Sequence, residues 1–100
     1  MNIKVIMSWD IIHGREQEYF EFVVRRFMPG VQKMGMVLSD AWVTIYGDAP
    51  QILVGAVVPG LDKAEKIIES EEWQQLNNRL LDFVHNYEVK LAPLQGGFQF

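Results

Sequence analysis

The 100-residue chain contains no cysteine and only two histidines. The lack of cysteine excludes a disulfide framework and a thiolate metal site, and it fits the reducing cytoplasm, which is the location we expect. Two histidines cannot build a typical zinc site alone. Segment 1–12 is apolar, but it contains Lys4 and Asp10, lacks a small-residue cleavage site and is too short to span a bilayer. We therefore predict neither a signal peptide nor a membrane partner.

Clustered positive charge is also scarce. The 9 Lys and Arg residues are outnumbered by 13 Asp and Glu residues, the formal net charge is -4, and only Arg25 and Arg26 are adjacent. Nucleic acid is therefore not an expected partner. Glycine-rich phosphate loops, paired histidines at metal-ligand spacing and Gly-x-Ser-x-Gly elbows are absent from the sequence, so we predict no cofactor and no metal. With 49% hydrophobic residues, residues 1–100 suffice for a single domain with a small core.

Hydrophobic periodicity predicts the elements of the first half. Alternating apolar residues indicate a strand over Asn2–Ile12, and helical spacing follows over Arg15–Met28. Pro29 should end or bend that helix, because an interior proline removes a hydrogen bond and costs about 3 kcal/mol. A short helical turn through 31–34, ended by Gly35, is the alternative to a bend.

Two further strands, Met36–Tyr46 and Gln51–Val58, are predicted to pair antiparallel through the turn Gly47-Asp48-Ala49-Pro50. Both strands are apolar on both faces, whereas the sheet of a lone two-layer domain normally keeps one face polar. We therefore expect a partner to cover the face remote from the helices, where we place Trp42 and Val54.

The second half is predicted to be helical. Asp62 and Glu65 have capping-box spacing and should begin a short helix over Leu61–Glu69. Ser70 should cap a long helix that continues to Leu91 and ends before Pro93, and a last strand is predicted over Phe98–Phe100. The apolar side of the long helix recurs at steps of three and four residues: Trp73, Leu76, Leu80, Val84, Tyr87 and Leu91.

The resulting order, β-α-β-β-α-β, predicts an α+β fold of the ferredoxin-like type, with the helices on one face of an antiparallel sheet. At this length, with the segment HGRE (13–16) before Tyr19 and Phe20 and with EWQQL (72–76) running to YEVKL (87–91), the chain resembles the dimeric α+β barrel superfamily, in particular its NIPSNAP-type and EthD-type branches. The resemblance implies a homodimer whose two sheets pack face to face. It implies no single reaction, because the superfamily includes cofactor-free oxygenases, polyketide cyclases, haem-degrading enzymes and proteins without assigned activity.

Four residues are candidate acid-base groups: His13, Asp10, His85 and Tyr46. His13 lies where the first strand meets the first helix, with Asp10 three residues before it, and the alternative role is that of a solvated loop histidine. His85 can contact Glu88 across one turn of the predicted long helix, or be half of an ordinary surface pair.

Four residues are candidate ligand contacts: Asn77, Trp73, Trp9 and Tyr19. Asn77 falls on the apolar arc of the long helix, where a buried amide needs backbone, water or ligand as a partner. The aromatic residues line either a cleft or the core.

Two hypotheses for the function follow. The first is a homodimeric barrel protein that binds a small apolar or aromatic ligand between the helices and the sheet. The second is a cofactor-free oxygenase or polyketide-cyclase-like enzyme acting on an aromatic substrate. A third, haem degradation with His85 as the iron ligand, is disfavoured by the polar neighbours of His85.

Overall fold

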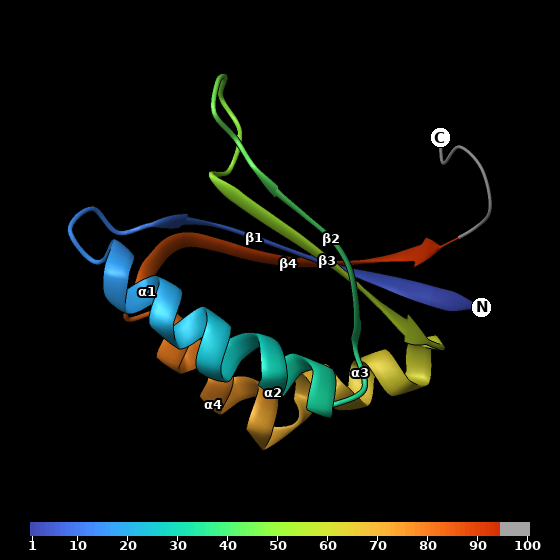
Figure 1. Ribbon diagram of the computed structural model, residues 1–100. Coiled ribbons are helices and arrows are strands. Elements are labelled where there is room, and N and C mark those ends of the chain that lie inside the picture. The colour runs from blue at the N-terminus through green and yellow to red at the C-terminus, as the bar shows by residue number, and fades with distance from the viewer. Residues whose placement is uncertain (95–100) are drawn as a thin grey trace.

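The computed structural model describes residues 1–94 as one antiparallel sheet with all helices on one of its faces (Figure 1). The sheet order is β2-β3-β1-β4, which confirms the predicted ferredoxin-like arrangement. The predicted strand Phe98–Phe100 lies outside the described residues. The elements are β1 (Asn2–Ile11), α1 (Glu16–Phe22), η1 (Val23–Phe27), α2 (Met28–Lys33), β2 (Val37–Val43), β3 (Ile52–Pro59), α3 (Leu61–Glu69), α4 (Glu71–Leu80) and β4 (Val84–Leu94).

β1 is the centre of the sheet, because β3 pairs with one of its edges and β4 with the other. Its alternating apolar residues are buried against the helices, as the pattern predicts: Val5, Met7 and Trp9 have no exposed surface. The even-numbered residues therefore point to the opposite side of the sheet. Within residues 1–94 no helix combines the length and apolarity that crossing a membrane needs.

The first helical stretch runs from 16 to 33 and passes Pro29 without ending there. The five residues before Met28 form η1, a π-helical stretch in which the N–H of Met28 donates to the carbonyl of Val23. This wider turn directly precedes Pro29, the second residue of α2, where a missing N–H is tolerated better than in the middle of a regular helix. The expected interruption at Pro29 is therefore replaced by a local change of helix type.

α3 has the predicted bounds, but it lacks the predicted cap. The residue before α3 is Gly60, with a φ of 102°, and no side chain caps the helix. The capping box predicted from Asp62 and Glu65 is therefore not formed. Ser70 does cap α4 as predicted, because its Oγ accepts a hydrogen bond from the N–H of Trp73 at 3.2 Å. Its extended backbone, with a ψ of 152°, separates α3 from α4.

The predicted long helix is wrong beyond Leu80. Residues 84–94 form β4, which pairs with β1 and completes the sheet. The pairing shifts between Ser8 and Asp10, and Asn86 has a φ of 56°, which marks a β-bulge. The bulge interrupts the alternation of β4, so its apolar residues recur at spacings that imitate a helix. The helical contact predicted between His85 and Glu88 is lost with that helix.

The sheet face away from the helices carries no covering element within residues 1–94 (Figure 1). Trp42 lies on this open face, as expected, and is 65% exposed. Val54 does not: it pairs with Met7, faces the helices and is 4% exposed, so its predicted place on the open face is wrong. The loop between β2 and β3 extends beyond the rest of the molecule (Figure 1).

Candidate functional site

The space between helices and sheet is filled by an aromatic cluster around Trp9. Its indole N–H donates to the hydroxyl of Tyr19 at 2.8 Å, and its ring stacks on Tyr87 at 6.0 Å and meets Phe27 edge to face at 5.7 Å. Burial raises the pKa of Tyr19, although the Trp9 bond opposes this, and burial also raises the pKa of Tyr87. Both phenols therefore stay protonated at neutral pH and act as hydrogen-bonding core residues, not as bases.

Asn77 is buried next to this cluster with both ends of its amide bonded. Its Nδ2 donates to the carbonyl of Trp73 at 2.7 Å, and its Oδ1 accepts from the hydroxyl of Tyr87. The bonds join α4 to β4, so the amide holds the helix on the sheet. The four residues predicted to contact a ligand, Trp9, Tyr19, Trp73 and Asn77, are all buried, and the bonds above link Trp9 to Tyr19 and Asn77 to Trp73.

The four predicted acid-base residues do not converge on one pocket. His13 is fully exposed at the turn after β1, with its Nδ1 3.8 Å from a carboxylate oxygen of Glu16. Tyr46 is 97% exposed in the loop between β2 and β3. Asp10 and His85, by contrast, are paired opposite each other across β1 and β4. Asp10 therefore has His85, not His13, as its neighbour.

Asp10 is the centre of a polar group at one end of the sheet. Its carboxylate accepts from the backbone N–H of Gln51 at 2.7 Å and from the Asn86 amide at 2.9 Å. The hydrogen bonds from the Asn86 side chain and the Gln51 N–H, with a minor contribution from His85, hold the pKa of Asp10 below its ordinary value, although burial opposes them. The carboxylate thus links β3 to the bulge of β4. Sequence spacing did not reveal this group, since Gln51 and Asn86 lie 41 and 76 positions from Asp10.

The open sheet face is mainly apolar on β2 and β3 and carries charged residues on β4, where Lys90 and Glu88 lie opposite Ile6 and Ser8. Val37 lies opposite Val57, and Trp42 lies opposite Leu53, all on the side away from the helices. The ion pair between Lys4 Nζ and Asp40 Oδ1, 2.9 Å apart, balances two of the charges on this face. Beyond its edge, Ile45 and Tyr46 are almost completely exposed.

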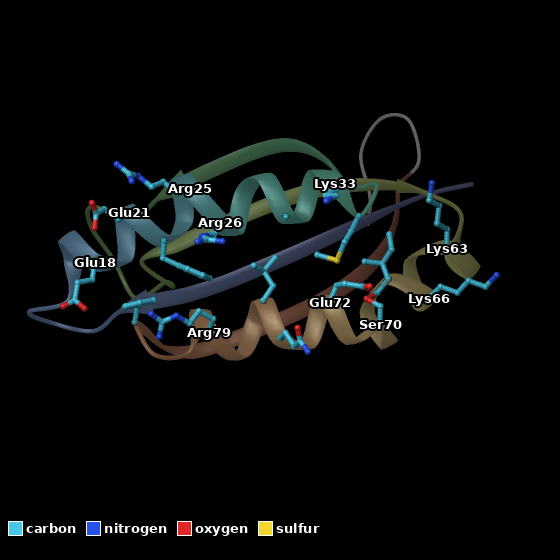
Figure 2. A pocket seen from close by; sticks show the side chains of 17 residues that line it. Glu18, Glu21, Arg25, Arg26, Lys33, Lys63, Lys66, Ser70, Glu72 and Arg79 are labelled. Atoms are coloured by element: carbon cyan, nitrogen blue, oxygen red, sulfur yellow. The ribbon is translucent and has the colours of Figure 1, made fainter.

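A second surface feature lies on the outer side of the helices. A hollow of about 1220 Å³, which we name the helical groove, separates the stretch 16–33 from α3 and α4 (Figure 2). A side chain at Gly30 of α2 would meet Leu76 of α4 at 2.9 Å, so this glycine permits the close approach of the two helices. Within residues 1–94 there is no cluster of three potential metal-binding side chains. The groove depends on helix spacing, which the sequence pattern does not reveal.

Comparison with solved structures shows the same fold in several proteins. A NIPSNAP family protein from Agrobacterium tumefaciens C58 has a TM-score of 0.70 and 22% identity, with 96% of this chain and 95% of that one covered. An ethyl tert-butyl ether d (EthD) family protein from Bacillus halodurans C-125 has a TM-score of 0.68 and 14% identity, with 95% of this chain and 100% of that one covered. A dimeric protein of unknown function with a ferredoxin-like fold from Bacteroides fragilis NCTC 9343 has a TM-score of 0.60 and 12% identity, covering 93% and 96%.

These similarities confirm the predicted fold resemblance to NIPSNAP-type and EthD-type proteins. No family model and no curated protein sequence matches the chain. At such low identity the fold is shared, while the activity must be argued from the site itself.

The bonds of Asn77 lead to a first prediction. Asn77→Leu should lower the free energy of unfolding by about 1–3 kcal/mol, because the hydroxyl of Tyr87 and the carbonyl of Trp73 lose a buried partner. Tyr87→Phe removes one of those orphaned groups. In urea denaturation the double variant should therefore be less destabilised than the sum of the single variants by at least about 0.5 kcal/mol. Strictly additive losses would contradict the pairing.

Asp10 leads to a prediction about pH. Since its folded-state pKa is depressed, its contribution to stability is present above the unfolded-state pKa of about 3.9 and is lost as the pH falls through the lower folded-state value. Because the group is partly solvated, Asp10→Asn should cost only about 0.5–1 kcal/mol at pH 7. Denaturation at pH 7 and pH 3 should show this difference shrinking at the lower pH. An equal loss at both values would rule out the charged carboxylate as its source.

Proposed function

We propose that the protein is a homodimer formed through the open sheet face, and that it binds a small apolar ligand without chemical turnover. The observation that carries the dimer is the apolar surface left on the sheet opposite the helices, with Trp42 65% and Val37 66% exposed. Contiguous apolar surface of this kind on a small protein is typical of an interface. The dimeric ferredoxin-like neighbour from Bacteroides fragilis supports self-association.

The ion pair between β1 and β2 on this face is compatible with burial. Lys4 and Asp40 are already half-buried and paired with each other, so a covering surface would not isolate either charge. The exposed residues Ile45 and Tyr46 extend the apolar surface along the loop beyond the sheet edge. A second copy would supply the same apolar surface and the same loop in a two-fold arrangement. An obligate interface of this kind buries on the order of 2,000 Å² in total.

The proposed ligand site is the helical groove. The space between helices and sheet is occupied by the aromatic cluster, whereas the groove offers a hollow of about 1220 Å³ with apolar side chains such as Leu76 and Phe83 in its lining. Hollows that hold small molecules have volumes of about 300–1,000 Å³, so the groove offers more space than one such ligand needs. The cytoplasm remains the proposed location, because the cysteine-free sequence fits a reducing compartment.

The dimer is tested by a matched pair of charged substitutions. Trp42→Glu lies on the open face, and Val24→Glu lies on the helical side at nearly the same exposure, 65% against 67%. In sedimentation velocity at micromolar concentration, the wild type and Val24→Glu should be dimers and Trp42→Glu a folded monomer, because the interface would bury an unpaired carboxylate. A monomeric wild type, or a dimeric Trp42→Glu, would refute the proposed interface.

One observation favours a second candidate, the cofactor-free enzyme acting on an aromatic compound. Asp10 and His85 are the two predicted acid-base residues that lie together, and both face away from the helices. A carboxylate beside an imidazole can hold and orient it as a proton acceptor.

The enzyme hypothesis is tested by incubating aromatic and polyketide-like compounds with the protein and following them by mass spectrometry. If the protein is an enzyme, the wild type and the variant His13→Ala, which alters only an exposed turn, should both consume a compound. The variant His85→Ala should consume it at least about tenfold more slowly. Binding without consumption in all three proteins would support the non-catalytic function instead.

A further inference from the structure

The helical groove has a charge that differs from that of the molecule as a whole. Its lining contains three acidic residues, Glu18, Glu21 and Glu72. It also contains six of the nine basic residues of this net negative chain: Arg25, Arg26, Lys33, Lys63, Lys66 and Arg79. Since residues scattered singly along the sequence gather here in space, the groove should attract anions while the rest of the surface repels them.

The positive charge is unevenly distributed along the groove. Figure 2 shows Lys33, Lys63 and Lys66 toward one end and Arg25, Arg26 and Arg79 toward the other, where Glu18 and Glu21 also lie. At the arginine end, Arg79 is paired with Asp82 and packs over Phe83. The three lysines take part in none of the ion pairs formed within residues 1–94, and the same holds for Arg25 and Arg26. Because Glu18 and Glu21 lie beside the arginines, whereas Glu72 is the one acidic lining residue near the lysines, the lysine end has the larger excess of positive charge (Figure 2).

The floor between the two ends is apolar. Phe22 and Phe83 lie 5.5 Å apart at the arginine end, while Leu76 fills the centre next to Gly30. Lys33 lies eleven residues after Phe22 along the helix, or about 16 Å at 1.5 Å per residue. A ligand that places its charge at the lysines and its apolar part on this floor must therefore be elongated.

We propose that the helical groove binds a free long-chain carboxylate, with its headgroup at Lys33, Lys63 and Lys66 and its unbranched tail on the floor toward Phe22 and Phe83. This inference rests on the proposed ligand-binding function and names the ligand class. Lysine ammonium groups are suited to this headgroup because each can donate several hydrogen bonds to a carboxylate from a flexible stem.

Two other anionic partners fit less well. Glu72 lies at the lysine end (Figure 2), so a headgroup with one negative charge is repelled less than a doubly charged phosphate monoester. An anionic membrane surface would contact the whole helical face and would also meet Glu18 and Glu21, which lie away from a headgroup at the lysines. A hollow also suits a small ligand that can enter it better than it suits a flat membrane surface.

The test is isothermal titration calorimetry of the full-length protein with octanoate, decanoate and dodecanoate below their micelle concentrations. Affinity should rise about two- to fourfold for each added methylene, because each buries apolar surface on the floor. Dodecanol, with the same tail and no charge, should bind at least about tenfold more weakly than dodecanoate. Dodecyl phosphate and vesicles that contain an anionic phospholipid complete the set of probes.

Substitutions locate the headgroup. The triple variant Lys33→Gln, Lys63→Gln, Lys66→Gln should weaken dodecanoate binding by about tenfold or more but leave dodecanol binding unchanged. Its control is Lys90→Gln, which removes an exposed lysine from β4 on the opposite side of the molecule and should change dodecanoate affinity less than about twofold. Circular dichroism checks that the triple variant keeps its fold.

Each outcome decides between the proposals. Equal binding of dodecanol and dodecanoate, or an unaffected triple variant, would overturn the carboxylate inference and leave apolar ligand binding intact. Tighter binding of dodecyl phosphate, or binding to vesicles alone, would overturn it in favour of a phosphate headgroup or a membrane surface. If none of the probes binds, the ligand-binding function fails together with the inference, whereas the dimer is decided separately by sedimentation.

Discussion

The fold depends on the position of β1 between two other strands. β3 and β4 bond to its two edges, so β1 runs through the middle of the sheet. Because side chains alternate along a strand, its odd-numbered residues meet the helices and its even-numbered residues lie on the open face. Trp9 on this strand contacts Tyr19 of α1 and Tyr87 of β4, so one side chain ties the helical layer to two strands. The alternation of apolar residues in β1 thus determines which face of the sheet the helices cover and which face stays open.

The predicted ligand residues lie in the core, where their polar groups bond to one another or to the backbone. An indole N–H, a phenol and an amide in an apolar layer must each find a partner, since an unsatisfied one costs about 1–3 kcal/mol. Trp9, Tyr19, Asn77 and Tyr87 satisfy one another or the backbone. The same residue types that suggest a binding cleft in the sequence therefore join the helices to the sheet in the structure.

Elements with an unbroken period could be predicted from the sequence, whereas the interrupted period of β4 led to a wrong prediction. β1 and α3 follow their patterns to within one residue of the predicted bounds. β4 was missed because the bulge at Asn86 places its apolar residues at helix-like spacing. The Asp10 group and the helical groove depend on strand register and on the spacing of helices at Gly30, which involve residues distant in sequence.

All helices of the described chain lie on one side of the sheet, so the helical groove and the open face point in opposite directions (Figure 1). If two copies associate through their open faces, as we propose, their grooves lie on opposite outer surfaces of the assembly. The dimer then presents two equivalent openings that cannot engage one flat surface together, so avidity for a single surface is excluded by geometry. Such a particle instead carries two independent ligands, or contacts two separate bodies at once.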